Sequence, residues 1–146
     1  MRSPTEVFAE LVDGVAKLVV GDASQVDRLA ALYAEQTDVR HPMAPLGDTP
    51  LQTREDLRRH FASRPNGSPP AMAGYHAADI RVHQTADPEV IVAEFTYRGA
   101  GVAAPCVFVM RVRDGLIVES RDYLPHLEFA RVRGQLEDLF ERLAVR

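Results

Sequence analysis

The chain has 146 residues, enough for one domain with a sizeable core, and 46% of them are hydrophobic while 26% are charged. Its net charge of −4, with no run of Lys or Arg longer than two, argues against a nucleic-acid or anionic-membrane surface. No apolar stretch approaches the roughly 18 residues that span a bilayer, and the N-terminus lacks a signal-peptide pattern. We therefore expect a cytoplasmic protein that binds neither nucleic acid nor membrane.

The cysteine and histidine residues indicate whether a disulfide or a metal site is to be expected. Cys106 is the single cysteine, so an internal disulfide is excluded, and we expect it to be a small buried residue. No Cys/His cluster has the spacing of a zinc site, and we expect no metal.

The N-terminal part is predicted to be helical. Ser3 can cap a helix that has Pro4 in its first turn and carries apolar residues at helical spacing as far as Val19. After a break at Gly-Asp, Ser24 can cap a second helix that reaches about Glu35.

A strand, a loop and a third helix are expected next. Residues 38–41 are predicted as a short strand, and residues 42–52 as a loop because they are rich in Pro and Gly. Thr53 can then cap a helix that carries Leu57 and Phe61 on one face.

The second half is predicted to be mostly sheet. A loop at 65–70 precedes it, and a last helix is expected from about Leu127 to Leu143, with Gly134 in its middle. Alternating side chains and tight turns place the strands at 74–85, 89–98, 104–113 and 116–124.

Helices followed by a run of strands indicate an α+β fold. We expect a cone-shaped, curved sheet, antiparallel or mixed, that wraps around the N-terminal helices. Such a cone has a closed apolar end and an open mouth in which a pocket forms naturally.

Strand alternation predicts which side chains face this interior. Its polar exceptions are expected to be His41, His76, Tyr97 and Asp122. The inward set comprises Val39, His41, His76, Ala78, Ile80, Val82, Ile91, Ala93, Phe95, Tyr97, Cys106, Phe108, Met110, Val112, Val118, Ser120, Asp122 and Leu124.

Asp122 is the candidate for chemistry, because a buried carboxylate is costly unless something uses or compensates it. Burial raises the pKa of a carboxyl group, which can then donate or accept a proton near neutral pH. His41 or His76 could assist. The alternatives are structural: Asp122 pairs with an arginine at the sheet rim, His41 is a core histidine, His76 is solvated, and Tyr97 only packs.

Four segments carry a resemblance to a known family. They are GDASQVDRLAALYAEQTDVRHP (21–42), TREDLRRHF (53–61), IRVHQTADPE (80–89) and RDGLIVESRDY (113–123). The chain resembles the SnoaL-like family of the nuclear-transport-factor-2-like, or ketosteroid-isomerase-like, superfamily. The resemblance implies one cystatin-like α+β barrel domain over residues 1–146. It leaves function open, because this scaffold hosts cyclases, isomerases, epoxide hydrolases, dehydratases and non-catalytic binders.

Two branches of the superfamily are similar at the last strand. The phenazine-biosynthesis branch has an acid that matches Asp122, while its histidine falls at Ala78. The limonene-epoxide-hydrolase branch also matches Asp122, in an Arg-Asp-Tyr motif. Its Arg-x-Asp pair falls at Phe95 and Tyr97, which disfavours epoxide hydrolysis.

The resemblance and the pocket chemistry together favour an enzyme. We expect a cyclase or isomerase that transfers protons on a hydrophobic, polyketide- or ketone-like substrate, with Asp122, His41 and His76 as catalytic residues. No nucleotide fingerprint is present, and we expect no cofactor. Alternatives are a non-catalytic binder of small hydrophobic ligands and an epoxide hydrolase. The expected substrate contacts are Tyr97, Phe95, Phe108, Met110, Phe61, Val39 and Ala78.

The outward side of the strands also carries an apolar patch, formed by Val90, Val92, Val107 and Val109. Exposed apolar patches commonly mark interfaces. Members of the superfamily often dimerise through this face, so we expect a homodimer.

Overall fold

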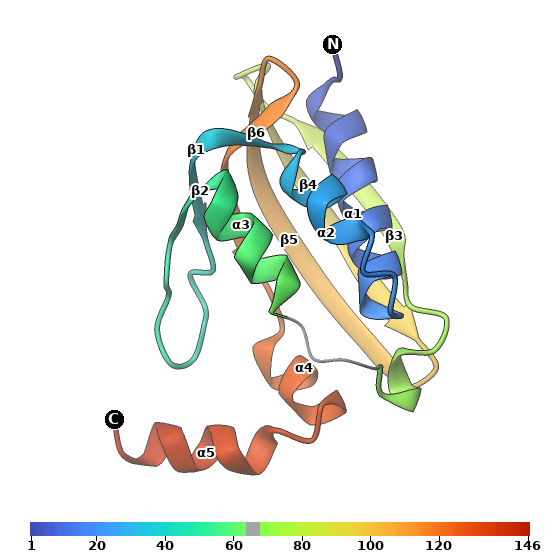
Figure 1. Cartoon of the computed structure of the whole chain (residues 1–146), viewed down its shortest axis with the longest axis vertical. Coiled ribbons are helices and arrows are strands. Elements are labelled where there is room, and N and C mark those ends of the chain that lie inside the picture. Colours follow the sequence, from blue (N-terminus) through green and yellow to red (C-terminus); the bar gives the residue numbers. More distant parts are fainter. Residues whose placement is uncertain (64–67) are drawn as a thin grey trace.

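The computed structural model describes residues 1–63 and 68–146, and three residues of the predicted loop at 65–70 therefore lie outside the described part. The described residues form helices and one sheet (Figure 1). In chain order the elements are α1 (Pro4–Val19), α2 (Gln25–Ala30), β1 (Tyr33–Arg40), β2 (Leu51–Thr53), α3 (Arg54–Ala62), the 3-10 helix η1 (Pro70–Met72), β3 (His76–Gln84), β4 (Val90–Gly99), β5 (Val102–Arg113), β6 (Leu116–Tyr123), α4 (His126–Val132) and α5 (Leu136–Ala144).

The sheet is mixed. Its strand order is β2-β1-β6-β5-β4-β3, in which β1 runs parallel to β6 and all other neighbours are antiparallel. Helices α1, α2 and α3 lie on one face of the sheet, and α4 and α5 lie at one end (Figure 1). The predicted α+β fold, a curved mixed sheet around N-terminal helices, is confirmed. No helix in the described ranges is long and apolar enough to cross a bilayer.

The core lies between α1 and the long strands. The Ser3 hydroxyl accepts a hydrogen bond from the Glu6 amide at 3.2 Å, which confirms the predicted cap of α1. The Phe8 ring then packs edge-on against Phe95 and Phe108, with ring centroids 5.2 and 6.3 Å away. Burying an aromatic side chain of this size stabilises the fold by about 1.5–3 kcal/mol.

The second predicted helix is wrong in its C-terminal half. Helix α2 ends at Ala30, and β1 begins at Tyr33. Residues 33–40 pair with β6 on one side and β2 on the other, and these long-range pairings override the local helix propensity of Ala34 and Glu35. Strand β2 begins inside the predicted loop and ends at the predicted cap Thr53, and it was missed because three residues are too few to show an alternating pattern.

The single C-terminal helix that we predicted is interrupted. Gly134 adopts a φ of 68°, a left-handed conformation that glycine tolerates without strain. The Gln135 amide donates to the Ala130 carbonyl at 2.8 Å, and the Gly134 amide donates to the Arg131 carbonyl at 3.1 Å. This glycine-based cap ends α4, so that α5 takes a new direction.

The four long strands are confirmed to within two residues at each end, but the faces of β3 are partly wrong. Asp79 has a φ of 54°, and the pairing register with β4 shifts between Ala78 and Arg81. The carboxylate of Asp79 accepts two hydrogen bonds from Arg98, at 2.8 and 3.1 Å. An extra residue in one strand reverses the sidedness of everything before it.

The reversal changes three predicted positions. Ala77 lies opposite the inward Tyr97, and Ala78 lies opposite the outward Thr96, so Ala78 does not face the interior. His76 is exposed, and Ile80 is 47% exposed at the bulge. Val82, beyond the bulge, packs against the core as expected.

Strand β6 contains a second bulge. The register shifts opposite Arg111 and Val112, so that Ile117 is fully buried and Val118 is only half-buried, contrary to expectation. Beyond the shift the predicted alternation holds. Ser120 lies opposite Met110 and Asp122 lies opposite Phe108, both on the inner face.

The helix caps give a test of local stability. The Thr53 hydroxyl accepts a hydrogen bond from the Asp56 amide at 3.0 Å, whereas Ser24, which we predicted as a cap, makes no capping bond. We expect Thr53→Ala to lower the free energy of unfolding by about 1 kcal/mol and Ser24→Ala by clearly less. Urea unfolding followed by circular dichroism measures both, and equal losses would contradict the assignment.

Candidate active site

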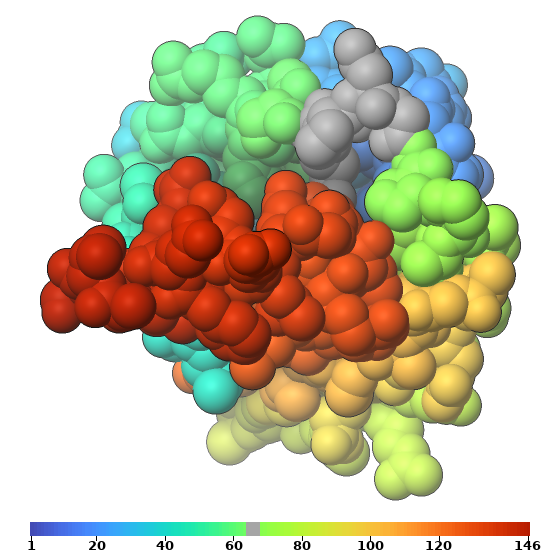
Figure 2. Space-filling model, turned by 90° about the horizontal axis from the view of Figure 1, so that it is seen from below, coloured from blue at the N-terminus to red at the C-terminus, as the bar shows by residue number. Residues whose placement is uncertain are grey.

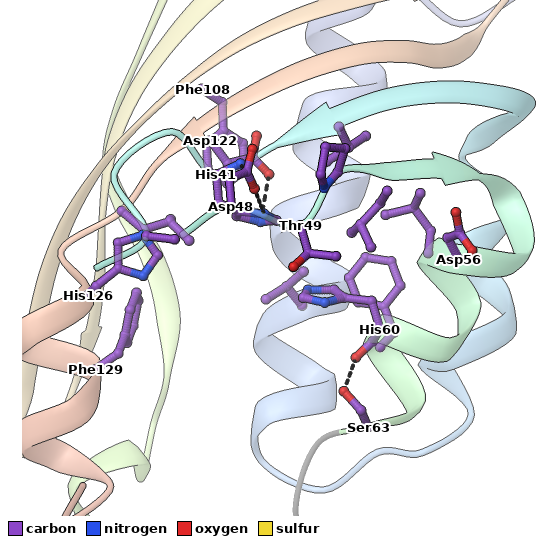
Figure 3. A pocket seen from close by; sticks show the side chains of 18 of the residues that line it. His41, Asp48, Thr49, Asp56, His60, Ser63, Phe108, Asp122, His126 and Phe129 are labelled. Carbon is purple, nitrogen blue, oxygen red and sulfur yellow. Dashed lines mark hydrogen bonds and ion pairs between the residues drawn. The ribbon is translucent and has the colours of Figure 1, made fainter. Parts of the chain in front are cut away.

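A cavity of about 810 Å³ opens between α3, the loop after β1, and α4 (Figure 3). These elements lie toward the lower end of the molecule as drawn in Figure 1. Seen from this end, the C-terminal segment lies across the molecule beside α3 (Figure 2). The lining residues are Leu11, Val15, Tyr33, Val39, His41, Ala44, Gly47, Asp48, Thr49, Pro50, Leu51, Asp56, Leu57, Arg59, His60, Phe61, Ser63, Tyr75, Tyr97, Phe108, Asp122, Leu124, His126, Phe129 and Arg133.

Asp122 is a buried carboxyl group in the wall of this cavity. Its side of β6 faces Phe108 on β5, and the residue is only 8% exposed. The Ser120 hydroxyl donates to its Oδ1. Burial raises the pKa of Asp122 from 3.8 to about 7, although the Ser120 hydrogen bond and the charge of Arg121 act in the opposite direction. Asp122 therefore exchanges a proton near neutral pH.

The expected alternative for Asp122, an ion pair with an arginine at the rim, does not occur among the described residues. The neighbouring Arg121 points to the other face and binds the Asp38 carboxylate at 3.0 Å. The side chain that approaches Asp122 is instead His41, whose Nε2 lies 3.7 Å from Asp122 Oδ2.

The parallel register of β1 and β6 explains this approach. Val39 lies beside Ser120 and Arg40 beside Arg121, so the next residue of each strand brings His41 beside Asp122. The loop between β1 and β2 then returns to His41, where the Asp48 carboxylate accepts a hydrogen bond from the His41 amide at 3.0 Å.

His41 thus lies between two carboxyl groups (Figure 3). Its Nδ1 is 4.0 Å from Asp48 Oδ1, on the side away from Asp122. Burial lowers the pKa of His41 below 6.5, and nearby His126 lowers it further, while Asp48 raises it. The net result at neutral pH is an uncharged imidazole beside a partly protonated carboxyl group.

Aromatic side chains form much of the remaining wall. The Tyr75 and Tyr97 rings are stacked at 4.8 Å with an interplanar angle of 15°. Tyr33 and Phe61 lie 6.2 Å apart on the opposite side, between β1 and α3. Burial, with a smaller contribution from Asp122, raises the pKa of Tyr33 well above 10, so its hydroxyl stays protonated. These walls suit a flat, hydrophobic molecule.

The structure brings together six of the residues that the sequence nominated for the site. Asp122, His41, Tyr97, Phe108, Phe61 and Val39 all line the cavity. Their roles in chemistry and binding remain predictions.

The other four nominated residues lie elsewhere. Phe95 and Met110 are buried in the core and are not among the described lining residues of this cavity. His76 is exposed, with its Nδ1 hydrogen-bonded to the Gly74 carbonyl at 2.8 Å. Ala78 lies on the outer side because of the bulge in β3. His76 and Ala78 were assigned from a strand pattern that the bulge at Asp79 interrupts.

The polar lining residues that the sequence analysis missed include Asp48, His60 and His126. Asp48 lies in the loop whose return path the sequence does not reveal. His60, predicted to be a surface residue, is exposed but also lines the cavity, with its ring 5.7 Å from that of His41. His126 directly precedes the residue at which we expected the last helix to begin. Its Nε2 is buried without a hydrogen-bond partner among the described residues.

Cys106 has the structural role that the sequence predicted. It is buried, and its thiol donates to the Ala104 carbonyl at 3.3 Å. Burial raises the pKa of this thiol to about 12, so it is not a thiolate nucleophile at neutral pH. Within residues 1–63 and 68–146, no group of three His, Cys, Asp or Glu side chains is arranged to hold a metal ion.

The raised pKa of Asp122 makes a prediction about stability. Between the ordinary value of 3.8 and about 7, the folded protein holds a proton that the unfolded chain releases. The cost of burying the carboxylate is thus absent below about pH 4 and complete above about pH 7. Relative to Asp122→Asn, we expect the wild-type free energy of unfolding to fall by about 3 kcal/mol between about pH 5 and pH 8.

Urea unfolding at several pH values measures this difference. Because His41 titrates in both proteins, its contribution is common to the two curves that are compared. The exposed Asp27→Asn is the matched control and should track the wild type at every pH. A difference between wild type and Asp122→Asn that does not change with pH would show that the carboxyl has an ordinary pKa.

Three solved structures with the same fold are compared with this chain. A phenazine biosynthesis-related protein from Pseudomonas aeruginosa is 15% identical, with a TM-score of 0.61 over 92% of this chain and 87% of that one. A proposed ketosteroid isomerase from Kribbella flavida is 20% identical, with a TM-score of 0.55 over 84% and 81%. A proposed polyketide cyclase from Pseudomonas putida is 18% identical, with a TM-score of 0.59 over 90% and 98%. At these identities the likeness shows the fold alone.

No curated protein sequence matches the chain. The model of the SnoaL-like domain matches residues 16–120, which run from the end of α1 through α2, α3 and the sheet as far as Ser120, and which include His41. Because this match covers most of the chain, the protein belongs to the SnoaL-like domain family.

Proposed function

We propose that the protein is a cyclase or isomerase that transfers protons on a hydrophobic, ketone-like substrate. The observation that carries this proposal is Asp122, a carboxyl group buried in the cavity wall with its pKa raised to about 7. A group with this pKa serves as both proton acceptor and proton donor near neutral pH. The family and the fold support the proposal, because neighbours on the same fold are described as isomerases and a polyketide cyclase.

The reaction begins with the carboxylate form of Asp122. It removes a proton from a carbon next to the substrate carbonyl, and the electron pair moves onto the carbonyl oxygen to form an enol or enolate. The resulting carboxylic acid then returns the proton to another carbon, which completes an isomerisation. In a cyclisation, the enolate carbon instead attacks a second carbonyl in the substrate, and the acid protonates the new alkoxide.

His41 assists from the same wall. Its Nε2 is 3.7 Å from Asp122 Oδ2, close enough for both groups to reach one substrate functional group. As an uncharged imidazole it can donate a hydrogen bond to the oxygen on which charge develops. Asp48 lies on the other side of the ring, 4.0 Å from Nδ1, and its carboxylate accepts a hydrogen bond from the His41 amide, which fixes the backbone at this residue.

The cavity fits a substrate of this kind. Its volume of about 810 Å³ lies within the range of about 300–1,000 Å³ that small-molecule sites occupy. The Tyr75, Tyr97 and Phe108 rings offer flat apolar surfaces, and Asp122 and His41 place two polar groups beside each other in the wall.

The proposal predicts the effect of neutralising Asp122. With polycyclic β,γ-unsaturated ketones as probes, Asp122→Asn should lower kcat by about 10²–10⁴-fold, because general acid–base catalysis contributes that much. His41→Gln should lower it by a smaller factor. Ultraviolet absorbance of the conjugated product follows the reaction, and wild-type kcat/KM should rise with pH through about 7 as Asp122 ionises.

Glu119→Gln is the matched control. It neutralises a carboxylate on the same strand but on the opposite face, and it should leave kcat unchanged. If probes bind to the wild type and to Asp122→Asn with equal affinity and neither protein turns them over, the cavity belongs to a non-catalytic binder and the catalytic proposal fails.

We also propose that two copies associate through the outer sheet face. No helix of residues 1–63 and 68–146 covers this face (Figure 1). It presents the directly paired Val92 and Val109 beside Val90 and Val107, all half-buried in one copy. Covering such a patch with its own symmetry mate would remove apolar surface from water.

Light scattering tests the association. The wild type should have close to twice the 16.2 kDa mass of one chain at micromolar concentration, and Val109→Glu should have the mass of one chain. Val20→Glu adds the same charge at an exposed site after α1 and should remain a dimer. A wild-type mass of about 16.2 kDa would refute the proposal.

A further inference from the structure

Helix α4 presents a row of three different side chains to the cavity. His126, Phe129 and Arg133, at the start, middle and C-cap of α4, all line it. Spacings of three and seven residues lie on one face of a helix, and seven residues span about 10 Å along its axis. Figure 3 shows His126 and Phe129 on the opposite side of the cavity from His60. We call these three residues the α4 strip.

Arg133 is the unusual member of the strip. It is half-buried, and among the described residues it has neither an ion pair nor a hydrogen-bond partner. Arg59, the other arginine of the lining, binds the Asp56 carboxylate at 2.9 Å. Because the Arg133 guanidinium has no anionic partner within ion-pair distance in the described part of the chain, it can pair with an anionic ligand that enters the cavity.

The acidic residues of the lining are already engaged. Asp56 accepts hydrogen bonds from the Arg59 side chain and from the Gln52 amide. Asp48 accepts from the His41 amide, and Asp122 accepts from Ser120. The uncompensated positive charge of Arg133 is therefore available to a ligand that enters the cavity.

His126 adds a second unsatisfied group on the same face. Its Nε2 is buried and has no partner among the described residues, so a rotation of the ring toward the cavity would let a polar atom of a ligand supply the missing hydrogen bond. Phe129 lies between His126 and Arg133 along the helix and offers an apolar contact. The order of the strip is thus polar, apolar, cationic.

One guanidinium matches a carboxylate well. Its planar pair of N–H groups forms two parallel hydrogen bonds with the two carboxylate oxygens. A phosphate, with its greater charge, would need more cations than the one unpaired arginine found in the described lining. The aromatic side chains of the wall favour a flat ring system for the rest of the ligand.

We propose that the substrate is an aromatic or alicyclic carboxylate, with its carboxylate bound by Arg133, its ring against Phe129 and a polar substituent hydrogen-bonded to His126. This inference rests on the proposed function, since it names the substrate class of the same cavity. The reacting carbon then lies near Asp122, and the carboxylate lies about 10 Å from His126 along α4.

Binding of naphthoate and of its uncharged methyl ester tests the proposal by isothermal titration calorimetry at neutral pH. The wild type should bind naphthoate about tenfold more tightly than the ester, the amount that one charge-assisted contact typically contributes. Arg133→Gln should abolish this preference and Arg133→Lys should keep part of it. Arg28→Gln removes the same charge from an exposed site on α2, outside the described lining, and should keep the full preference.

Equal wild-type affinities for the two probes, or an unchanged preference in Arg133→Gln, would overturn the inference. If Arg133→Gln does not fold, added potassium chloride replaces it as the test. Salt should weaken binding of naphthoate to the wild type and leave the ester unaffected, and equal salt effects on both would overturn the inference.

The two proposals can fail separately. Asp122→Asn should retain the Arg133-dependent preference for naphthoate, because Arg133 and not Asp122 contacts the carboxylate. A preference that persists in a protein without turnover supports the α4 strip and contradicts the catalytic proposal. Turnover of uncharged ketones that is lost in Asp122→Asn, combined with no preference for naphthoate, supports catalysis and contradicts the strip.

Discussion

The parallel pairing of β1 with β6 is the constraint on which the rest of the site depends. All other neighbouring strands of the sheet are antiparallel. This one pairing carries His41 to the side of Asp122, although the two residues are far apart in the sequence. Asp122 itself is buried opposite Phe108 on the inner face of the sheet, and this loss of water raises its pKa.

The cavity itself is assembled from segments that contribute different properties. The sheet and α1 supply an apolar wall. The loop after β1 supplies Asp48, whose carboxylate accepts a hydrogen bond from the His41 amide. The C-terminal segment completes the mouth. Gly134 turns the chain after α4, and the Arg146 side chain then donates to the Pro45 carbonyl at 2.7 Å, so the end of the chain contacts the loop that carries Asp48. This arrangement joins the last residues of the chain to the polar side of the site.

The two faces of the sheet carry different kinds of side chain. Inward residues of β4, β5 and β6 build the core and end at Asp122, while the outward residues are valines and charged side chains in ion pairs. Strict alternation of side chains along a strand makes this division possible. Two bulges, at Asp79 in β3 and near Ile117 in β6, interrupt it without disturbing the stretch that carries Asp122.

The sequence by itself determined the features that depend on near neighbours along the chain. These include the caps at Ser3 and Thr53, the four long strands, and the inward position of Asp122, because hydrogen-bonding caps and a period of two are local properties. The α+β class followed from the order of these elements.

Only the tertiary structure decided which polar groups meet. The bulge at Asp79, held by Arg98 on the neighbouring strand, moved His76 and Ala78 away from the interior. Pairing with distant strands turned residues 33–40 into β1, and the placement of α4 brought His126 to the cavity. Each of these outcomes depends on contacts between residues remote in the sequence, which local periodicity does not encode.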